Sequence, residues 1–157
     1  MGDSMIKYFL LWIYLTNIYV WADMIFLTTE FEEIKINIIN QRYIAQYNDG
    51  TSQYLMDIED RLENGVNEFL IYDYNFDGYK DLAIFKSTDS RKLNNSYQLF
   101  YYNHYTGKFD NGANLTNPTV EGKFVIENTI GYEYIQYRYI WNGKNLELHS
   151  KVSQERD

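Results

Sequence analysis

Turn signals recur between runs of β-prone residues in this 157-residue chain, and they constrain its fold more than any other feature. Asn48-Asp49-Gly50, Thr106-Gly107 and Asn142-Gly143 each separate two such runs, and Gly78 lies in a fourth turn. Asn-Gly and Asp-Gly pairs tolerate the positive φ that tight hairpins require. Because the glycines follow one another at loosely regular intervals, the pattern predicts antiparallel hairpins in a meander or propeller-like arrangement.

The residues between the turns are typical of strands. Ile34, Ile36 and Ile38 fall on one face of a strand, since polar residues alternate with them. The chain holds 17 Tyr, 9 Phe and a single proline, and long helical patterns are absent. Aromatic and β-branched side chains suit a half-buried pleated surface. We therefore predict a small, mainly-β, antiparallel domain, with its longest polar loops at residues 86–96 and 110–120.

One turn, at residues 73–81, has the side-chain pattern of a calcium loop. Oxygen-bearing side chains occupy alternate positions, and Gly78 permits a sharp turn. Ca²⁺ takes six to eight oxygen ligands, and a tight loop supplies most of them from alternate residues. The candidate ligands are Asp73, Asn75, Asp77, the main-chain carbonyl of Tyr79, and Asp81, directly or through water.

The flanks of this loop distinguish it from an EF-hand. An EF-hand needs a bidentate Glu at loop position 12, where this chain has Ile84. Residues 68–72 and 82–85 are short, apolar and β-prone, so we predict a calcium site between two strands. Water or an outside ligand, such as Asp60 or Glu63, would complete the coordination shell. The alternative is an Asp/Asn/Gly turn that closes a hairpin without a metal.

The N-terminal segment indicates the cellular compartment of the protein. Residues 8–22 form an apolar run that follows Lys7. The run is too short to span a bilayer, which takes about 20 residues, but it suits the apolar region of a secretory signal. The run ends on Val20-Trp21-Ala22, which has small residues at the two positions that a signal peptidase recognises. We predict a signal peptide over residues 1–22 and a periplasmic or secreted domain over 23–157, without a membrane anchor after cleavage. An uncleaved anchor and a buried apolar element are the alternatives.

Charge and composition exclude several classes of function. A balance of 22 Asp+Glu against 14 Lys+Arg gives a net charge of −8, which leaves no basic face for nucleic acid and favours a basic protein partner. The absence of cysteine excludes disulfides and thiolate chemistry. Only His104 and His149 are present, and no catalytic motif accompanies them. The acidic residues between 57 and 63 are more typical of a solvated surface than of a carboxylate pair. We therefore expect a protein that is not an enzyme.

The order of these features resembles a known family. The 73–81 loop followed by Leu82, the aromatic strand 97–102, the turn at 106–109 and the closing hairpin at 139–146 are similar to those of small bacterial periplasmic calcium-binding immunity proteins. Those proteins guard cells against lysozyme-like, peptidoglycan-cleaving effectors. They look like β-propellers and are akin to inhibitors of invertebrate-type lysozyme. The resemblance covers roughly residues 65–150, and it implies the same five residues as the Ca²⁺ site.

The resemblance also implies a surface for the partner. In the lysozyme-inhibitor relatives, a loop that contains Ser-Gly and ends in Tyr enters the enzyme cleft. The most similar segment here is 129–134, which lacks the Ser-Gly pair. The resemblance implies Tyr132, Glu133 and Tyr134 as partner-binding residues. The alternative is that they are ordinary strand residues after a turn. The expected function is that of an exported, calcium-stabilised immunity protein that inhibits a lysozyme-like peptidoglycan hydrolase. The alternative is a calcium-stabilised adhesion or surface-binding module.

Overall fold

The computed structural model describes residues 25–28, 33–59, 68–89 and 94–155, and these residues form strands and turns without a helix. The chain falls into two compact units, Met1–Asp57 and Ile58–Asp157. In the described part, no helix is long and apolar enough to cross a membrane. Residues 1–22 lie outside the described residues, as do Asp60 and Glu63, so the signal peptide and the additional calcium ligands stay predictions.

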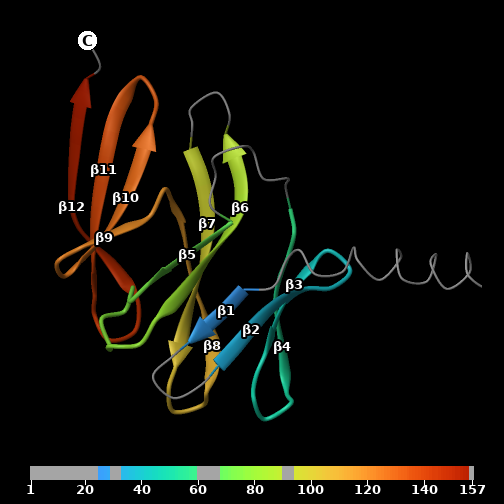
Figure 1. Ribbon diagram of the computed structural model, residues 1–157. Coiled ribbons are helices and arrows are strands. Elements are labelled where there is room, and N and C mark those ends of the chain that lie inside the picture. Colours follow the sequence, from blue (N-terminus) through green and yellow to red (C-terminus); the bar gives the residue numbers. More distant parts are fainter. Residues whose placement is uncertain (1–24, 29–32, 60–67, 90–93, 156–157) are drawn as a thin grey trace, which may run out of the picture. The chain divides into compact units, whose positions relative to one another are not determined.

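The first unit contains one antiparallel four-stranded meander (Figure 1). Ile34 and Ile36 are fully buried, in agreement with the alternation in the sequence. On the neighbouring strand, Tyr43 and Ala45 are buried as well. Arg42 and Asp57 form an exposed ion pair at 3.1 Å. The strands are β1 (Ile25–Thr28), β2 (Glu33–Ile38), β3 (Arg42–Gln46) and β4 (Ser52–Asp57).

The second unit contains two more antiparallel four-stranded meanders, in the orders β5-β6-β7-β8 and β12-β11-β10-β9. The prediction of a mainly-β meander built from hairpins is therefore confirmed. The strands of the first sheet are β5 (Phe69–Tyr72), β6 (Asp81–Asp89), β7 (Asn94–Asn103) and β8 (Lys108–Thr116). Those of the second sheet are β9 (Thr119–Glu121), β10 (Phe124–Ile130), β11 (Glu133–Trp141) and β12 (Leu146–Glu155).

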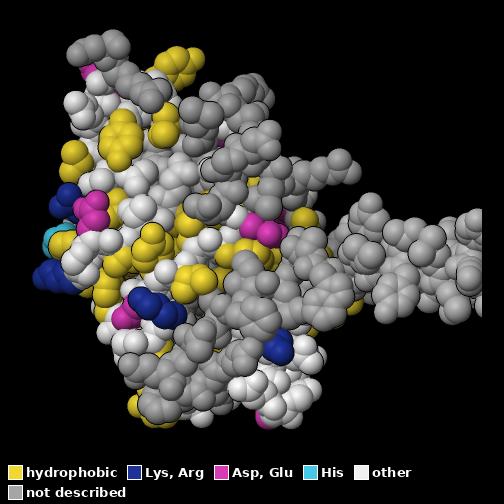
Figure 2. Space-filling model, in the orientation of Figure 1, with side chains coloured by type: hydrophobic (Ala, Val, Ile, Leu, Met, Phe, Trp, Pro, Cys, Tyr) yellow, Lys and Arg dark blue, Asp and Glu magenta, His cyan; other side chains and the backbone are white. Residues whose placement is uncertain are grey.

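The two sheets of the second unit share a hydrophobic core. Its fully buried members include Leu99 on β7 and Val125 on β10, and Trp141 on β11 packs against them. β12 lies at the edge of its sheet, and Figure 2 shows charged side chains of both signs at this outer edge. Charged side chains on an edge strand disfavour pairing with another chain. The remaining buried members of the core are Tyr74, Ala83, Phe85, Tyr97, Tyr101 and Leu115.

The glycines expected at the hairpin turns have the backbone conformation that such turns need. Gly50, Gly78, Gly107 and Gly143 have φ values of 80°, 92°, 66° and 93°. Each lies between two paired strands, so the sequence located four hairpins correctly.

The two long polar loops expected from the sequence are mostly strand, so that prediction was wrong. β6 extends to Asp89 and β7 begins at Asn94, while β8 and β9 cover most of 110–120. The polar side chains there bond to one another or to backbone. Thr88 Oγ1 donates to Asn95 Oδ1 at 2.9 Å, and Asn117 Nδ2 donates to the carbonyl of Asn128 at 3.1 Å. Hydrogen bonds of this kind let polar residues stay in a sheet.

Candidate metal centre and the adjoining pocket

The loop between β5 and β6 turns three side-chain oxygen groups towards its own backbone. Asp73 accepts hydrogen bonds from the N–H groups of Asp77 and Gly78, at 3.1 and 3.0 Å. Asn75 Oδ1 accepts from the N–H of Asp77 at 3.1 Å, and Asp77 Oδ1 accepts from the N–H of Tyr79 at 2.9 Å. The structure therefore gathers Asp73, Asn75 and Asp77 around one tight turn. Their remaining oxygen lone pairs are the kind of donor that Ca²⁺ prefers.

The backbone of this loop is tightly coiled. Phe76 has a φ of 60° and Gly78 a φ of 92°, both in the left-handed region. A bulky residue rarely adopts such a φ, because its Cβ approaches the carbonyl oxygen. The Asp77 N–H donates hydrogen bonds to Asp73 and Asn75, which precede Phe76 in the chain, so these bonds hold the strained residue in place.

Asp81 ties the loop to the end of β7. Its side chain is fully buried, and its oxygens accept hydrogen bonds from the N–H groups of Tyr74 at 2.8 Å, Asn75 at 3.2 Å and Tyr102 at 2.8 Å. Burial raises the pKa of the Asp81 carboxyl to about 7, although these three donors oppose the shift. A cation nearby would favour the ionised form and lower this pKa.

The four predicted ligands that would bind through their side chains therefore fall into two groups. Asp73, Asn75 and Asp77 line the turn, whereas Asp81 directs its carboxylate to backbone N–H groups. Within the described residues, no three acidic or histidine side chains converge into a metal-binding group. The ring of Tyr79 stacks on His104 at 4.6 Å and 14° between planes. The residue types fit calcium, and the ligand set stays a prediction.

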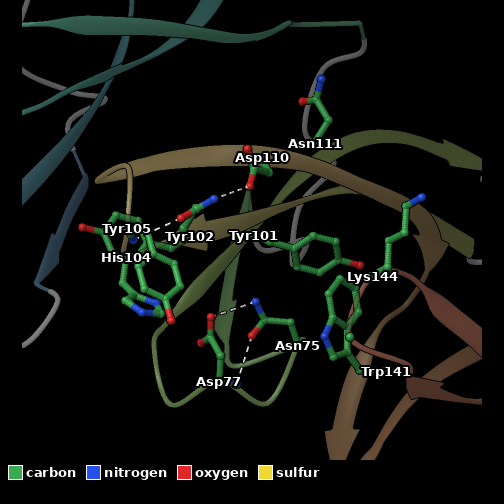
Figure 3. A pocket seen from close by; sticks show the side chains of 12 residues that line it. Asn75, Asp77, Tyr101, Tyr102, His104, Tyr105, Asp110, Asn111, Trp141 and Lys144 are labelled. Carbon is green, nitrogen blue, oxygen red and sulfur yellow. Dashed lines mark hydrogen bonds between the residues drawn. The ribbon is translucent and has the colours of Figure 1, made fainter.

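A pocket of about 520 Å³ adjoins the loop, and the sequence did not predict it (Figure 3). Its walls include three connections, namely the loop with Asn75 and Asp77, the β7–β8 turn with His104 and the β11–β12 turn with Lys144. Residues of the strands β7, β8 and β11 complete the walls. The ring of Tyr101 lies 4.8 Å from that of Trp141, so two aromatic side chains from different sheets meet there. These residues are far apart in the sequence, and no periodic pattern links them.

The predicted partner-binding residues lie at the hairpin between β10 and β11. Tyr132 is fully exposed and Glu133 is exposed, whereas Tyr134 is half-buried and donates its hydroxyl to Asn128 Oδ1 at 2.5 Å. The hairpin base is fixed, because Asn94 exchanges hydrogen bonds of 2.9 and 2.8 Å with the backbone of Ile130.

This hairpin and the pocket lie at opposite ends of β11. The strand has nine residues, from Glu133 at the hairpin to Trp141 in the pocket wall. With a rise of about 3.3 Å per residue, the two ends are roughly 25 Å apart. The hairpin therefore makes no contact with the candidate calcium loop.

Comparisons with protein-family models, with curated proteins and with solved structures found no match.

Proposed function

We propose that this chain is an exported, calcium-stabilised protein that binds and inhibits a lysozyme-like peptidoglycan hydrolase, through the hairpin that carries Tyr132. The observation that carries this proposal is a fully exposed tyrosine on a hairpin whose base is fixed by Asn94. Rigid aromatic side chains are the residues that most often anchor protein interfaces, because they bury a large area at a low cost in conformational entropy.

The two neighbours of Tyr132 support the same surface in different ways. Glu133 is exposed beside Tyr132 and adds a negative charge to the tip of the hairpin. The whole chain carries a net charge of −8, so electrostatic attraction would speed its association with a basic enzyme. Tyr134 is half-buried and bonded to Asn128, so it supports the hairpin and presents less area than Tyr132.

Calcium has a supporting role in this proposal. The 73–81 loop belongs to the other sheet and lies at the opposite end of the second unit, so the ion would stabilise this unit without touching the target. Asp81 would transmit this effect, since it bonds the loop to the backbone of β7. Asn94, which fixes the hairpin, is the first residue of the same strand.

The test is the clearing of a cell-wall suspension by an invertebrate-type lysozyme, and by a bacterial lysozyme-like peptidoglycan hydrolase, with and without the protein. Inhibition is expected, and Tyr132→Ala should weaken binding by about 2 kcal/mol if the ring is the anchor. Tyr105→Ala is the matched control, because Tyr105 is 88% exposed at the opposite end of the unit and should leave inhibition unchanged. Undiminished clearing by both enzymes at molar excess would reject the inhibitor proposal in favour of an adhesion module.

A further inference from the structure

The pocket beside the 73–81 loop has the size and the lining of a small-molecule site. Its volume of about 520 Å³ falls within the range of about 300–1,000 Å³ that is usual for such sites. Tyr101 and Trp141 lie on one side of the pocket, and His104 and Tyr105 on another (Figure 3). A site of this kind offers ring faces for apolar contact and polar groups that orient the ligand.

The charges around the pocket favour an uncharged ligand. Asp77 and Asp110 contribute two carboxylates, and Lys144 contributes an ammonium group. The two carboxylates would repel a strongly anionic ligand, and the lysine ammonium would repel a strongly cationic one. A neutral ligand that is rich in hydrogen-bonding groups avoids both conflicts.

Several polar groups of the pocket are already engaged. Asn75 Nδ2 donates to Asp77 at 3.0 Å, and Asn103 Nδ2 donates to Asp110 Oδ2 at 2.9 Å. By contrast, the Asn111 amide, the Lys144 ammonium and the Trp141 indole N–H make no hydrogen bond or ion pair with the described part of the chain. The pocket therefore presents unused donors close to aromatic rings.

We propose that this pocket binds an uncharged saccharide. A sugar ring has a face of C–H groups, which packs on an aromatic ring such as Trp141. Its hydroxyls both donate and accept hydrogen bonds, and they match the Asn111 amide, the Lys144 ammonium and the Asp110 carboxylate. The proposal is independent of the hydrolase inhibition, because the Tyr132 hairpin lies at the other end of β11.

The test is a calorimetric titration of the full chain with three soluble trisaccharides: tri-N-acetylchitotriose, cellotriose and maltotriose. At least one should bind with a dissociation constant below about 1 mM. Asn111→Ala and Lys144→Ala should each weaken that binding by at least about tenfold, because each removes an unused donor. Both residues are exposed, so both variants should melt at the temperature of the unsubstituted protein.

Tyr132→Ala is the control, and its affinity for the same trisaccharide should be unchanged. The proposal is overturned if none of the three sugars binds, or if one binds equally well to the Asn111 and Lys144 variants. It is also overturned if Nα-acetyl-lysine methylamide binds while the sugars do not, since the pocket would then be a cation site.

Discussion

Two buried polar side chains of the 73–81 loop differ in their hydrogen bonding. The Asp81 carboxylate accepts three backbone hydrogen bonds. The Tyr74 hydroxyl is buried and has no hydrogen-bond partner in the described part of the chain. Burial raises the pKa of Tyr74 well above its usual range, so the hydroxyl stays neutral. A satisfied and an unsatisfied polar group should respond in opposite directions when they are replaced.

Asp81→Asn should destabilise the protein. An amide oxygen can accept the hydrogen bonds of one carboxylate oxygen, but the amide NH₂ would face the remaining N–H donor. A buried donor without a partner costs about 1–3 kcal/mol, and the loss should appear as a lower free energy of unfolding in urea at pH 8. Asp110→Asn is the control, because Asp110 is exposed and the change there should stay within about 0.5 kcal/mol. Equal effects of the two substitutions would contradict the role given to Asp81.

Tyr74→Phe should leave the stability unchanged or raise it by up to about 1 kcal/mol, because it removes a desolvated hydroxyl and keeps the ring in the core. Tyr139→Phe is the matched control. The Tyr139 hydroxyl donates to Glu127 Oε2 at 2.7 Å, so its loss should cost about 1 kcal/mol. Urea denaturation measures both, and a loss of 1 kcal/mol or more for Tyr74→Phe would show that its hydroxyl has a partner in solution.

At the scale of elements, the sequence predicted the hairpins but did not predict the tertiary contacts of their residues. Turn glycines act locally, so Gly50, Gly78, Gly107 and Gly143 located four turns without knowledge of the core. The strand β8 was expected to be a loop because its sequence is polar. It pairs with β7 through backbone hydrogen bonds, and Gln98 Nε2 adds a bond of 2.8 Å to the carbonyl of Gly112.

The roles of the buried residues and of the pocket residues depend on contacts between residues that are far apart in the sequence. Asp81 was predicted only as a calcium ligand, since its partner Tyr102 is 21 residues away. The pairing of Tyr101 with Trp141 joins two sheets in the same way. No local pattern marks such contacts, so the oxygen-rich turn at 73–81 was recognisable from the sequence and the pocket was not.

Gly112→Ala should distort the β7–β8 pair. An added Cβ at Gly112 would lie 2.6 Å from Tyr101 Cε2 and 3.0 Å from Leu99 Cβ, so the ring of Tyr101 would have to move. Overpacking of this kind costs about 1–3 kcal/mol, which thermal unfolding should show as a lower midpoint. Gly131→Ala is the control, since its nearest contact would be an ordinary 3.7 Å to the carbonyl of Glu133. Similar midpoints for the two variants would contradict the close packing of Tyr101 on Gly112.

At the scale of the whole molecule, the candidate functional features all belong to the second unit. The 73–81 loop and the pocket lie at one end of its sheets, and the Tyr132 hairpin lies at the other. The first unit, Met1–Asp57, contributes none of the residues of these sites in the described part. A ligand stabilises the cooperative unit that holds its site, so a bound ion should stabilise the second unit and leave the stability of the first unchanged.

Calcium should therefore slow amide hydrogen exchange in β5–β8 and leave exchange in β2–β4 almost unchanged. At 100 times its dissociation constant, an ion adds about 2.7 kcal/mol to the stability of the unit that binds it, which corresponds to about a hundredfold slower exchange through global opening of that unit. Exchange followed by mass spectrometry, with calcium and with a chelator, measures the difference for each strand. Asp77→Ala should abolish the effect, because it removes an oxygen ligand from the centre of the loop, whereas Asp110→Ala should preserve it. Protection that rises equally in both units would mean that they unfold together, and no rise in either would reject the metal site.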